Sequence, residues 1–315
     1  MYLGAGDGGA VWSGPEHHVL VVGPPRSGKT TSIVIPTIAL HRGPIVAKST
    51  KPDLVYVTAR RRAQLGRVWL WDPTATTAVP PGVEPLRWSP VQGCQDWDTA
   101  IARAWALATA ARPNQHLSDA AHWVERAQAL LAALLHAAAL TQGDVAVVLS
   151  WIHRRELAAP LSLLAYQKAH LAADLLTGIA ATEAREQSGI FSTADSILSA
   201  YRSEAALHAA RHPNFDPEAF VNSADTVYVC AHGAAQAQQA PLVVALLQHI
   251  RDAIMRRRQP WPPVIWCLDE VANIAPIPDP PTSWPTPPPK ASSSSPASRT
   301  SPKPAPAEAT PPTAS

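Results

Sequence analysis

A glycine-rich loop followed by Lys29 and Thr30 carries the strongest chemical signal in this sequence. Residues 23–30 read G-P-P-R-S-G-K-T, which has the spacing of a Walker A phosphate-binding loop. Backbone N–H groups of such a loop can surround a β-phosphate, Lys29 can reach the β- and γ-phosphate oxygens, and the Thr30 hydroxyl can bind Mg²⁺. The loop therefore predicts ATP and Mg²⁺ as cofactors, against the alternative of a Gly/Pro turn that happens to contain a lysine. The predicted nucleotide-binding residues are Gly23, Pro24, Pro25, Arg26, Ser27, Gly28, Lys29, Thr30 and Thr31.

A second motif ends in two carboxylates. Residues 264–270 read V-I-W-C-L-D-E, an apolar run typical of a Walker B strand. An acidic group at the carboxyl end of such a strand can hold Mg²⁺, so Asp269 is a predicted metal ligand together with Thr30. Glu270 can polarise an attacking water as general base, and we predict it as catalytic together with Lys29. Solvated strand ends are often acidic, but the pairing with the phosphate loop favours ATP hydrolysis.

An alternation of strands and helices must position these two motifs. Apolar runs of strand length occur at 18–22, 45–48, 67–71, 226–231 and 264–268. Helical patterns separate them at 29–40, 52–65 and 236–258. Strands separated by helices predict a parallel sheet with right-handed crossovers, and hence an α/β fold.

Only helical patterns occur between about residues 97 and 210. In the predicted helix 122–139, Trp123, Ala127 and Leu130 repeat at the spacing of one helix face. Further helices are predicted at 98–111, 144–152, 154–158, 160–175, 179–187 and 191–209. The sequence thus predicts an inserted all-α domain at 96–211 between two parts of the NTPase domain, 1–95 and 212–278, followed by a tail at 279–315.

Composition narrows the class of protein. The chain has 315 residues and a net charge of +2, so bulk charge predicts neither nucleic-acid nor membrane binding. Its three cysteines are isolated, which argues against a zinc site; Cys230 and Cys267 lie in apolar runs and are expected in the core. No apolar run is long enough to span a bilayer, so we expect a soluble chain. The tail 279–315 is rich in Pro, Ser, Thr and Ala and is expected to be disordered.

The segment Ser49-Thr50-Lys51-Pro52-Asp53 opens the predicted second helix. It follows a strand, and ligands of open α/β folds bind at the carboxyl edge of the sheet. Ser49 or Thr50 could act only as the helix N-cap, or could both cap the helix and lie close to the nucleotide.

Two arginine clusters, Arg60–Arg62 and Arg256–Arg258, lie near predicted helix ends. Cations are favourable there against the helix dipole, and contact with a DNA backbone is the alternative. Arg185 and Glu186 in the helical region are interpreted as an intrahelical ion pair.

Taken together, these motifs resemble the coupling proteins of type IV secretion systems, the TraG/TraD-type conjugative ATPases. The resemblance rests on VLVVGPPRSGKT, STKPDL, REQSGIFSTA, NFDPEAFV, TVYVCA and LDEVANIAPIPD and covers about residues 1–278. It implies a RecA-like P-loop NTPase sheet with an inserted all-α domain, and a homo-hexamer that binds nucleotide between subunits. It also implies that DNA and relaxosome proteins are recruited to a type IV secretion channel at the inner membrane. The implied location is the cytoplasm, peripheral to the membrane.

The chain departs from the family at two places. We expect the chain to lack the amino-terminal membrane anchor of the family, and to carry the Pro/Ser-rich tail in place of the helix and strand that follow Walker B in the family. That strand ends in a glutamine which senses the γ-phosphate, and later elements supply an arginine in trans. We therefore expect a truncated ATPase with slow or absent turnover.

The tail itself suggests an out-of-frame reading of the missing segment. Serine codons of the TCN type, shifted back by one base, encode only Phe, Leu, Ile or Val, so Ser292–Ser295 would become an apolar strand. Arg299 and Thr300 would be compatible with Gln and Asp, and the family pattern first fails at Pro280. The alternative is an evolved linker, and the nucleotide sequence across codons 275–300 would decide between them.

Three functions follow from these observations. The first is a coupling-type ATPase that pumps DNA, and the second is a chromosomal DNA translocase of the FtsK/HerA type. The inserted helices and STKPDL favour the first. The third is a nucleotide-binding remnant or recruitment module without hydrolysis; DNA-stimulated turnover that depends on Lys29 and Glu270 would separate it from a motor.

Overall fold

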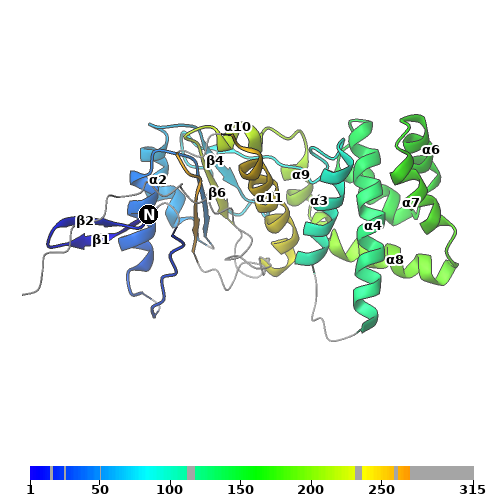
Figure 1. Ribbon diagram of the computed structural model, residues 1–315, viewed down its shortest axis with the longest axis horizontal. Helices are drawn as coiled ribbons and strands as arrows, with labels where there is room; N and C mark the ends of the chain where they lie inside the picture. Colours follow the sequence, from blue (N-terminus) through cyan, green and yellow to red (C-terminus); the bar gives the residue numbers. More distant parts are fainter. Residues whose placement is uncertain are drawn as a thin grey trace, which may run out of the picture. The chain divides into compact units, whose positions relative to one another are not determined.

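A five-stranded parallel sheet forms the α/β part of the fold (Figure 1). Its strands, in spatial order, are β5 (Glu84–Pro85), β4 (Val68–Trp71), β6 (Thr226–Cys230), β3 (Ile45–Ser49) and β7 (Ile265–Leu268). All neighbouring pairs are parallel, and their registers place Ser49 opposite Cys230 and Lys48 opposite Leu268. The carboxyl ends of β3, β6 and β7 therefore meet at one edge, as the strand–helix alternation predicts.

This computed structural model describes residues 1–14, 17–24, 26–49, 51–111, 118–230, 236–258 and 262–269, which all belong to the unit Met1–Pro285. Pro25, Thr50, Glu270 and the tail 279–315 lie outside the described residues. The predicted disorder and reading frame of the tail therefore stay predictions, as does the division at residues 95, 211 and 278. None of the described helices is long and apolar enough to cross a membrane.

The predicted strand at 18–22 is wrong. Residues 17–24 form neither helix nor strand, and Leu20 and Val22 are 84% and 85% exposed. A strand is stable only when its backbone groups pair with a neighbour. Within the described ranges β7, at the edge of the sheet, pairs only with β3, and no strand takes up residues 18–22.

The helix predicted at 29–40 forms as two joined pieces. A π-helical turn, η1 (Thr30–Val34), leads into α1 (Ile35–Leu40). Pro36 lies in the first turn of α1 and has no N–H to donate to the preceding turn, which explains the change in winding. After β3 comes α2 (Asp53–Arg62), which matches the predicted helix 52–65 but ends earlier.

The region between residues 97 and 210 is helical, as predicted, but its helices begin and end at other residues than predicted. Its helices are α3 (Trp97–Ala110), α4 (Ser118–Leu140), α5 (Val145–Arg154), α6 (Ala158–Tyr166), α7 (His170–Ala180), α8 (Ala184–Ile197), η2 (Ser199–Arg202) and α9 (Glu204–Ala210). The helix predicted at 154–158 is wrong, because Arg155 takes a left-handed conformation (φ 52°) and ends α5. Lys168 does the same (φ 58°) and divides 160–175 into α6 and α7. The predictions 179–187 and 191–209 likewise run across breaks between helices.

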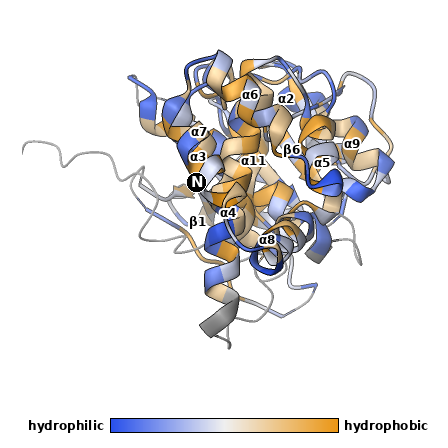
Figure 2. Cartoon of the chain, turned by 90° about the vertical axis from the view of Figure 1, so that its right-hand side faces the viewer, coloured by the Kyte–Doolittle hydropathy of each residue, from blue (hydrophilic) through white to orange (hydrophobic). Residues whose placement is uncertain are grey.

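Two helices return the chain to the sheet. They are the short α10 (Pro217–Val221) and the long α11 (Gln236–Arg256), which separates β6 from β7 in sequence. Figure 2 shows apolar residues along α4 and α11 in the middle of the view and hydrophilic residues at the outer turns.

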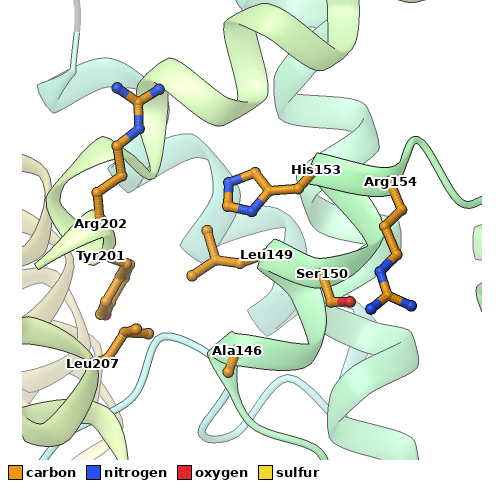
Figure 3. A pocket seen from close by; sticks show the side chains of 8 residues that line it. All are labelled: Ala146, Leu149, Ser150, His153, Arg154, Tyr201, Arg202 and Leu207. Carbon is orange, nitrogen blue, oxygen red and sulfur yellow. The ribbon is translucent and has the colours of Figure 1, made fainter. Parts of the chain in front are cut away.

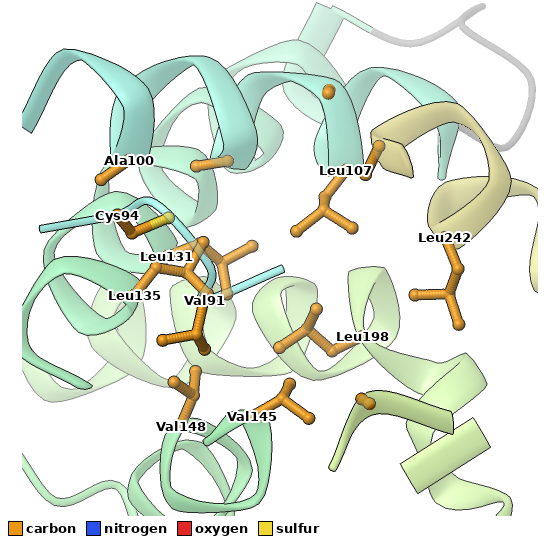
Figure 4. Close-up of a cluster of buried hydrophobic side chains, with 14 of the residues drawn as sticks. Val91, Cys94, Ala100, Leu107, Leu131, Leu135, Val145, Val148, Leu198 and Leu242 are labelled. Atoms are coloured by element: carbon orange, nitrogen blue, oxygen red, sulfur yellow. The ribbon is translucent and has the colours of Figure 1, made fainter. Parts of the chain in front are cut away.

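One apolar cluster joins the sheet to the helices. Val46, Trp69 and Val227 on one face of the sheet belong to the same buried cluster as the interiors of α3, α4, α8 and α11. Figure 4 shows Leu131 of α4 close to Val91 and Cys94 inside this cluster. A second cluster, which includes Ile45, Tyr228 and Cys267, covers the other face of the sheet against α1 and α2.

The structure decides two predictions about side chains, one on buried cysteines and one on an ion pair. Cys230 and Cys267 are buried core residues, as expected, and burial raises the pKa of each thiol to about 12. Glu186 pairs with Arg126 of α4 at 3.4 Å, so the predicted intrahelical pair with Arg185 is wrong. The ion pair instead joins α8 to α4.

The arginine clusters lie at helix ends, as predicted. Arg62 is fully buried, Arg256 forms an ion pair with Glu218 at 2.6 Å, and Arg257 donates to the Pro262 carbonyl at 2.7 Å. These three side chains therefore have structural partners within the chain. Contact of the clusters with DNA stays an untested alternative.

The structure adds an element that the sequence pattern did not indicate. β1 (Tyr2–Gly6) and β2 (Gly9–Trp12) form an antiparallel two-stranded ribbon ahead of the phosphate loop. Figure 1 shows this ribbon beside the helices at the start of the chain.

Candidate nucleotide site

The phosphate loop is held by its own lysine. Lys29 Nζ donates hydrogen bonds to the carbonyl oxygens of Gly23 at 2.6 Å and Pro24 at 2.8 Å. The Ser27 N–H donates to the Pro24 carbonyl at 3.3 Å, which closes a turn inside the loop. Lys29 thus lies at the centre of the loop, where its ammonium group can meet phosphate oxygens in exchange for these carbonyls.

One loop position requires glycine. Gly28 has a φ of +82°, a left-handed conformation that disfavours a side chain, and an added Cβ would lie 3.3 Å from Ser32 Oγ. A Cβ at Gly23 would lie 2.9 Å from Ser27 Oγ, a contact that rotation of the Ser27 side chain can relieve. The requirement for glycine at position 28 is therefore conformational.

The helix that follows begins at Thr30. The Thr31 hydroxyl donates to the Gly28 carbonyl at 3.1 Å, and the Ser32 N–H donates to the same carbonyl at 2.8 Å. The first N–H groups of a helix have no partner within it, so this turn can offer donors to an anion.

Thr30 and Asp269 bring the two sequence motifs together. The Thr30 hydroxyl donates to Asp269 Oδ2 at 3.0 Å, and both residues are partly buried. A hydroxyl and a carboxylate oxygen are the hard donors that Mg²⁺ prefers. The residues present therefore fit a magnesium ion, which would add positive charge beside bound phosphates.

The backbone of β3 fixes Asp269. The Asp269 N–H donates to the Lys48 carbonyl at 2.9 Å, which extends the β3–β7 pairing by one residue. Lys48 is 1% exposed at the carboxyl end of β3. The signal for this residue in the sequence was a lysine within an otherwise apolar strand.

Ser49 is not the N-cap of α2. Its Oγ accepts from the Lys51 N–H at 3.2 Å, whereas the N-cap position is Pro52, without a side-chain hydrogen bond. Ser49 thus stabilises the turn before the helix, and a role close to the nucleotide stays a prediction. Of the predicted site residues, Pro25 and Glu270 lie outside the described part of the chain, and the others lie in the loop, in η1 or after β7.

A hollow of about 540 Å³ in the helical region is a second place where a ligand could lie. Its lining residues are Ala146, Leu149, Ser150, His153, Arg154, Tyr201, Arg202 and Leu207. Figure 3 shows Leu149, Tyr201 and Leu207 around its apolar part, with Arg154 turned to the other side. Asp195 lies 3.0 Å from His153 Nε2 and also pairs with Arg202, so the Arg202 guanidinium at the rim already has a carboxylate partner. This hollow offers no charge set that selects a ligand, in contrast to the loop.

Comparison with protein families identifies the chain. The sequence model of the type IV secretory system conjugative DNA transfer family matches residues 2–282. The chain belongs to this family. That assignment confirms the resemblance drawn from the motifs and agrees with the parallel α/β sheet and its helical insertion.

Curated relatives match over shorter stretches. Protein VirD4 of Rhizobium rhizogenes is 37% identical over 59 residues, and VirD4 of Rhizobium radiobacter is 39% identical over 59 residues. Each match covers 19% of this chain and 9% of the relative. The chain therefore aligns with only a small part of these curated relatives.

Solved structures of the plasmid coupling protein TrwB are similar at 15% identity. The unbound form has a TM-score of 0.44 over 74% of this chain and 56% of TrwB. The complex with ADP and Mg²⁺ has a TM-score of 0.44 over 76% of this chain and 59% of TrwB.

Proposed function

We propose that this chain binds ATP with Mg²⁺ and supplies the nucleotide-binding part of a conjugative coupling ATPase. The hydrogen bond between Thr30 and Asp269 carries the proposal, because it joins the phosphate loop to the acidic strand end at 3.0 Å. Membership of the conjugative DNA transfer family supports the same conclusion.

Each residue has a separate task in this proposal. Lys29 leaves the loop carbonyls and contacts the β- and γ-phosphates, while loop N–H groups bind the remaining phosphate oxygens. Thr30 and Asp269 would hold Mg²⁺, which would supply positive charge next to the phosphates. Glu270 follows Asp269 directly in the sequence and polarises the attacking water.

Family membership extends the proposal to partners. The substrates are DNA and relaxosome proteins, delivered to a type IV secretion channel at the inner membrane by a homo-hexamer with nucleotide between subunits. The chain acts on the cytoplasmic side, peripheral to the membrane. These partners and this assembly rest on the family and on no contact within the chain.

Hydrolysis by this chain is proposed to be slow or absent. The segment that leads into the loop lies outside the sheet, with Leu20 and Val22 exposed. A phosphate loop that is not fixed by a strand is less preorganised for the transition state, which lowers the rate more than it lowers nucleotide affinity. This observation favours a nucleotide-binding module without motor activity as the second candidate function.

Equilibrium binding tests nucleotide binding. Isothermal titration of the full chain with ATP and Mg²⁺ should give saturable binding, which Lys29→Gln abolishes. Lys168→Gln is the matched control, because Lys168 is an exposed lysine in the turn between α6 and α7. Absence of binding by the unmodified chain, or equal binding by Lys29→Gln, would overturn the proposal.

Turnover separates the two candidate functions. Phosphate release should be slow and unchanged by added DNA in the second function. A DNA-stimulated rate that disappears in both Lys29→Ala and Glu270→Gln would instead establish a motor.

A further inference from the structure

An exposed aromatic pair lies on the ribbon ahead of the phosphate loop. Tyr2 of β1 and Trp12 of β2 are cross-strand partners, with ring centroids 5.4 Å apart and planes at 69°. Trp12 is 51% exposed, so about half of the largest apolar side chain of the ribbon faces solvent. Because the two rings meet edge to face, the exposed part of the Trp12 ring is the surface on which another flat ring can stack, with Tyr2 holding Trp12 in place.

The ribbon is attached to the helix that carries the phosphate-loop threonine. β1 packs against η1, with Cα atoms within 8 Å. The Thr37 hydroxyl of α1 donates to the Tyr2 carbonyl at 3.4 Å. The Ser13 N–H donates to the Met1 carbonyl at 2.8 Å and closes the open end of the ribbon next to the aromatic pair.

These contacts place the backbone of the ribbon beside the helix that begins at the phosphate loop. Thr37 follows Thr30 by about two helical turns, or about 10 Å along the axis. The ribose and phosphates of a nucleotide can bridge such a span. A base could therefore reach Tyr2 and Trp12 while its phosphates stay in the loop.

We propose that Tyr2 and Trp12 form the base-stacking surface for the nucleotide held by Gly23–Thr31. This inference rests on the proposed function and adds a subsite to it. Stacking uses the π-face that every base has, so the surface favours a purine ring without selecting between adenine and guanine.

Charge on the ribbon favours a base over other occupants. Asp7 is the one charged residue between Tyr2 and Trp12, and it is acidic. Residues 2–12 contain no Lys or Arg, and the Met1 ammonium is hydrogen-bonded to Ser13 Oγ at 3.0 Å. The ribbon therefore attracts the phosphates of nucleic acid only weakly, whereas an uncharged ring needs no cation. The other ribbon residues are mostly Gly and Ala, which leave a flat surface beside the aromatic pair.

A ligand without a base separates this subsite from the phosphate loop. Titrations of the full chain use ATP or tripolyphosphate, each with Mg²⁺. Trp12→Ala should weaken ATP binding about fivefold or more and leave tripolyphosphate binding unchanged. Trp12→Phe should retain most of the ATP affinity because a ring remains. Trp105→Ala is the matched control, since Trp105 is 41% exposed on α3, and it should alter neither titration.

Each contrary result has a distinct meaning. Equal loss of ATP and tripolyphosphate binding in Trp12→Ala would show that Trp12 acts on the loop or on the fold, and would overturn the base subsite. Unchanged ATP binding by Trp12→Ala would also overturn the base subsite. If the sedimentation coefficient of this variant changes while its ATP affinity does not, Trp12 instead belongs to a contact between copies of the chain. If the unmodified chain binds tripolyphosphate and ATP with equal affinity, the proposed base subsite is overturned and the proposed phosphate site stands. A chain that binds neither also loses the proposed function.

Discussion

The Thr30 hydroxyl donates a 3.0 Å hydrogen bond to Asp269 Oδ2, although the two residues are 239 positions apart in the sequence. The bond forms because β7 pairs with β3 and continues to the Asp269 N–H, which donates to the Lys48 carbonyl at 2.9 Å. The pairing of two parallel strands therefore decides whether the two proposed metal ligands meet.

Thr30→Val tests the metal role of this pair. Valine has nearly the shape of threonine but lacks the oxygen, so the variant should keep its fold and lose a magnesium ligand. The advantage of ATP binding with Mg²⁺ over binding in EDTA should fall about tenfold, the size expected for a lost contact to a charged group. ATP titrations of Thr30→Val and of the unmodified chain, each with Mg²⁺ and with EDTA, measure this change.

Thr177→Val is the control for this experiment. Thr177 also lies in a helix, and its hydroxyl donates to the Ala173 carbonyl at 2.8 Å. The control should leave both titrations unchanged. Equal magnesium dependence in Thr30→Val and the unmodified chain would remove Thr30 from the metal site.

Gly189 and Gly178 provide a matched test of helix packing. A Cβ at Gly189 would lie 2.6 Å from Trp123 Cζ3, whereas nothing lies within 4 Å of a Cβ at Gly178. Gly189→Ala should lower the free energy of unfolding by about 1–3 kcal/mol, because α8 must move from the Trp123 ring. Gly178→Ala should raise it by up to about 1 kcal/mol, because alanine favours the helix.

Urea unfolding followed by circular dichroism measures both glycine variants. If Gly189→Ala is as stable as Gly178→Ala, the Trp123 ring moves without cost. The close approach of α8 to α4 would then not constrain the sequence.

Arg62 should contribute more to stability than its exposed neighbour Arg61. Arg62 is 0% exposed and donates to several oxygens around the starts of β3 and β6. These acceptors are the Thr226 hydroxyl and the carbonyls of His41, Gly43 and Ala224. Arg62→Met leaves them without a donor and should cost about 3 kcal/mol or more.

Arg61→Met is the internal comparison. The Arg61 side chain is exposed, and among the described residues it donates to Gln64 Oε1 alone, at 2.6 Å. Its replacement should change the free energy of unfolding by no more than about 0.5 kcal/mol. Equal losses in both variants would mean that the buried hydrogen bonds of Arg62 are replaced by water.

Much of the fold could be predicted because apolar runs and helix periodicity are local signals. β6 and β7 are mostly apolar runs, and β3 is an apolar run that ends in Lys48 and Ser49. The Thr30–Asp269 contact follows once the carboxyl ends of β3 and β7 share an edge of the sheet. The run at 18–22 has the same character as β6, yet only pairing with a neighbour makes a strand. Whether a segment pairs with a neighbouring strand depends on residues far away in the sequence, so the local pattern at 18–22 cannot predict it.

The predicted helix boundaries were wrong for another physical reason. Arg155 and Lys168 end helices in a left-handed conformation for which glycine or asparagine is the usual signal. The ribbon of β1 and β2 was missed because its glycines and alanines lack the alternation of a half-buried strand. The aromatic pair at Tyr2 and Trp12 became visible only when cross-strand register joined them.

The last prediction concerns pH and the buried His249. Burial lowers its pKa from 6.5 to about 2, and the positive charges of Arg103 and Arg256 add to this shift. The Trp88 Nε1–H donates to His249 Nδ1 at 3.0 Å, which requires the neutral ring. Below pH 6.5 the unfolded chain takes up a proton at this position and the folded chain does not, so stability falls as the pH falls. Between pH 7.5 and 5.0 this one group should remove about 2 kcal/mol.

His249→Asn isolates this effect, because an asparagine oxygen can still accept from Trp88 and does not titrate. Urea unfolding at pH 7.5 and 5.0 should show that the unmodified chain loses about 2 kcal/mol more than the variant. His208→Asn, an exposed change on α9, should lose as much as the unmodified chain. Identical losses in all three proteins would mean that His249 protonates in the folded state, and that water enters the junction between Trp88 and α11.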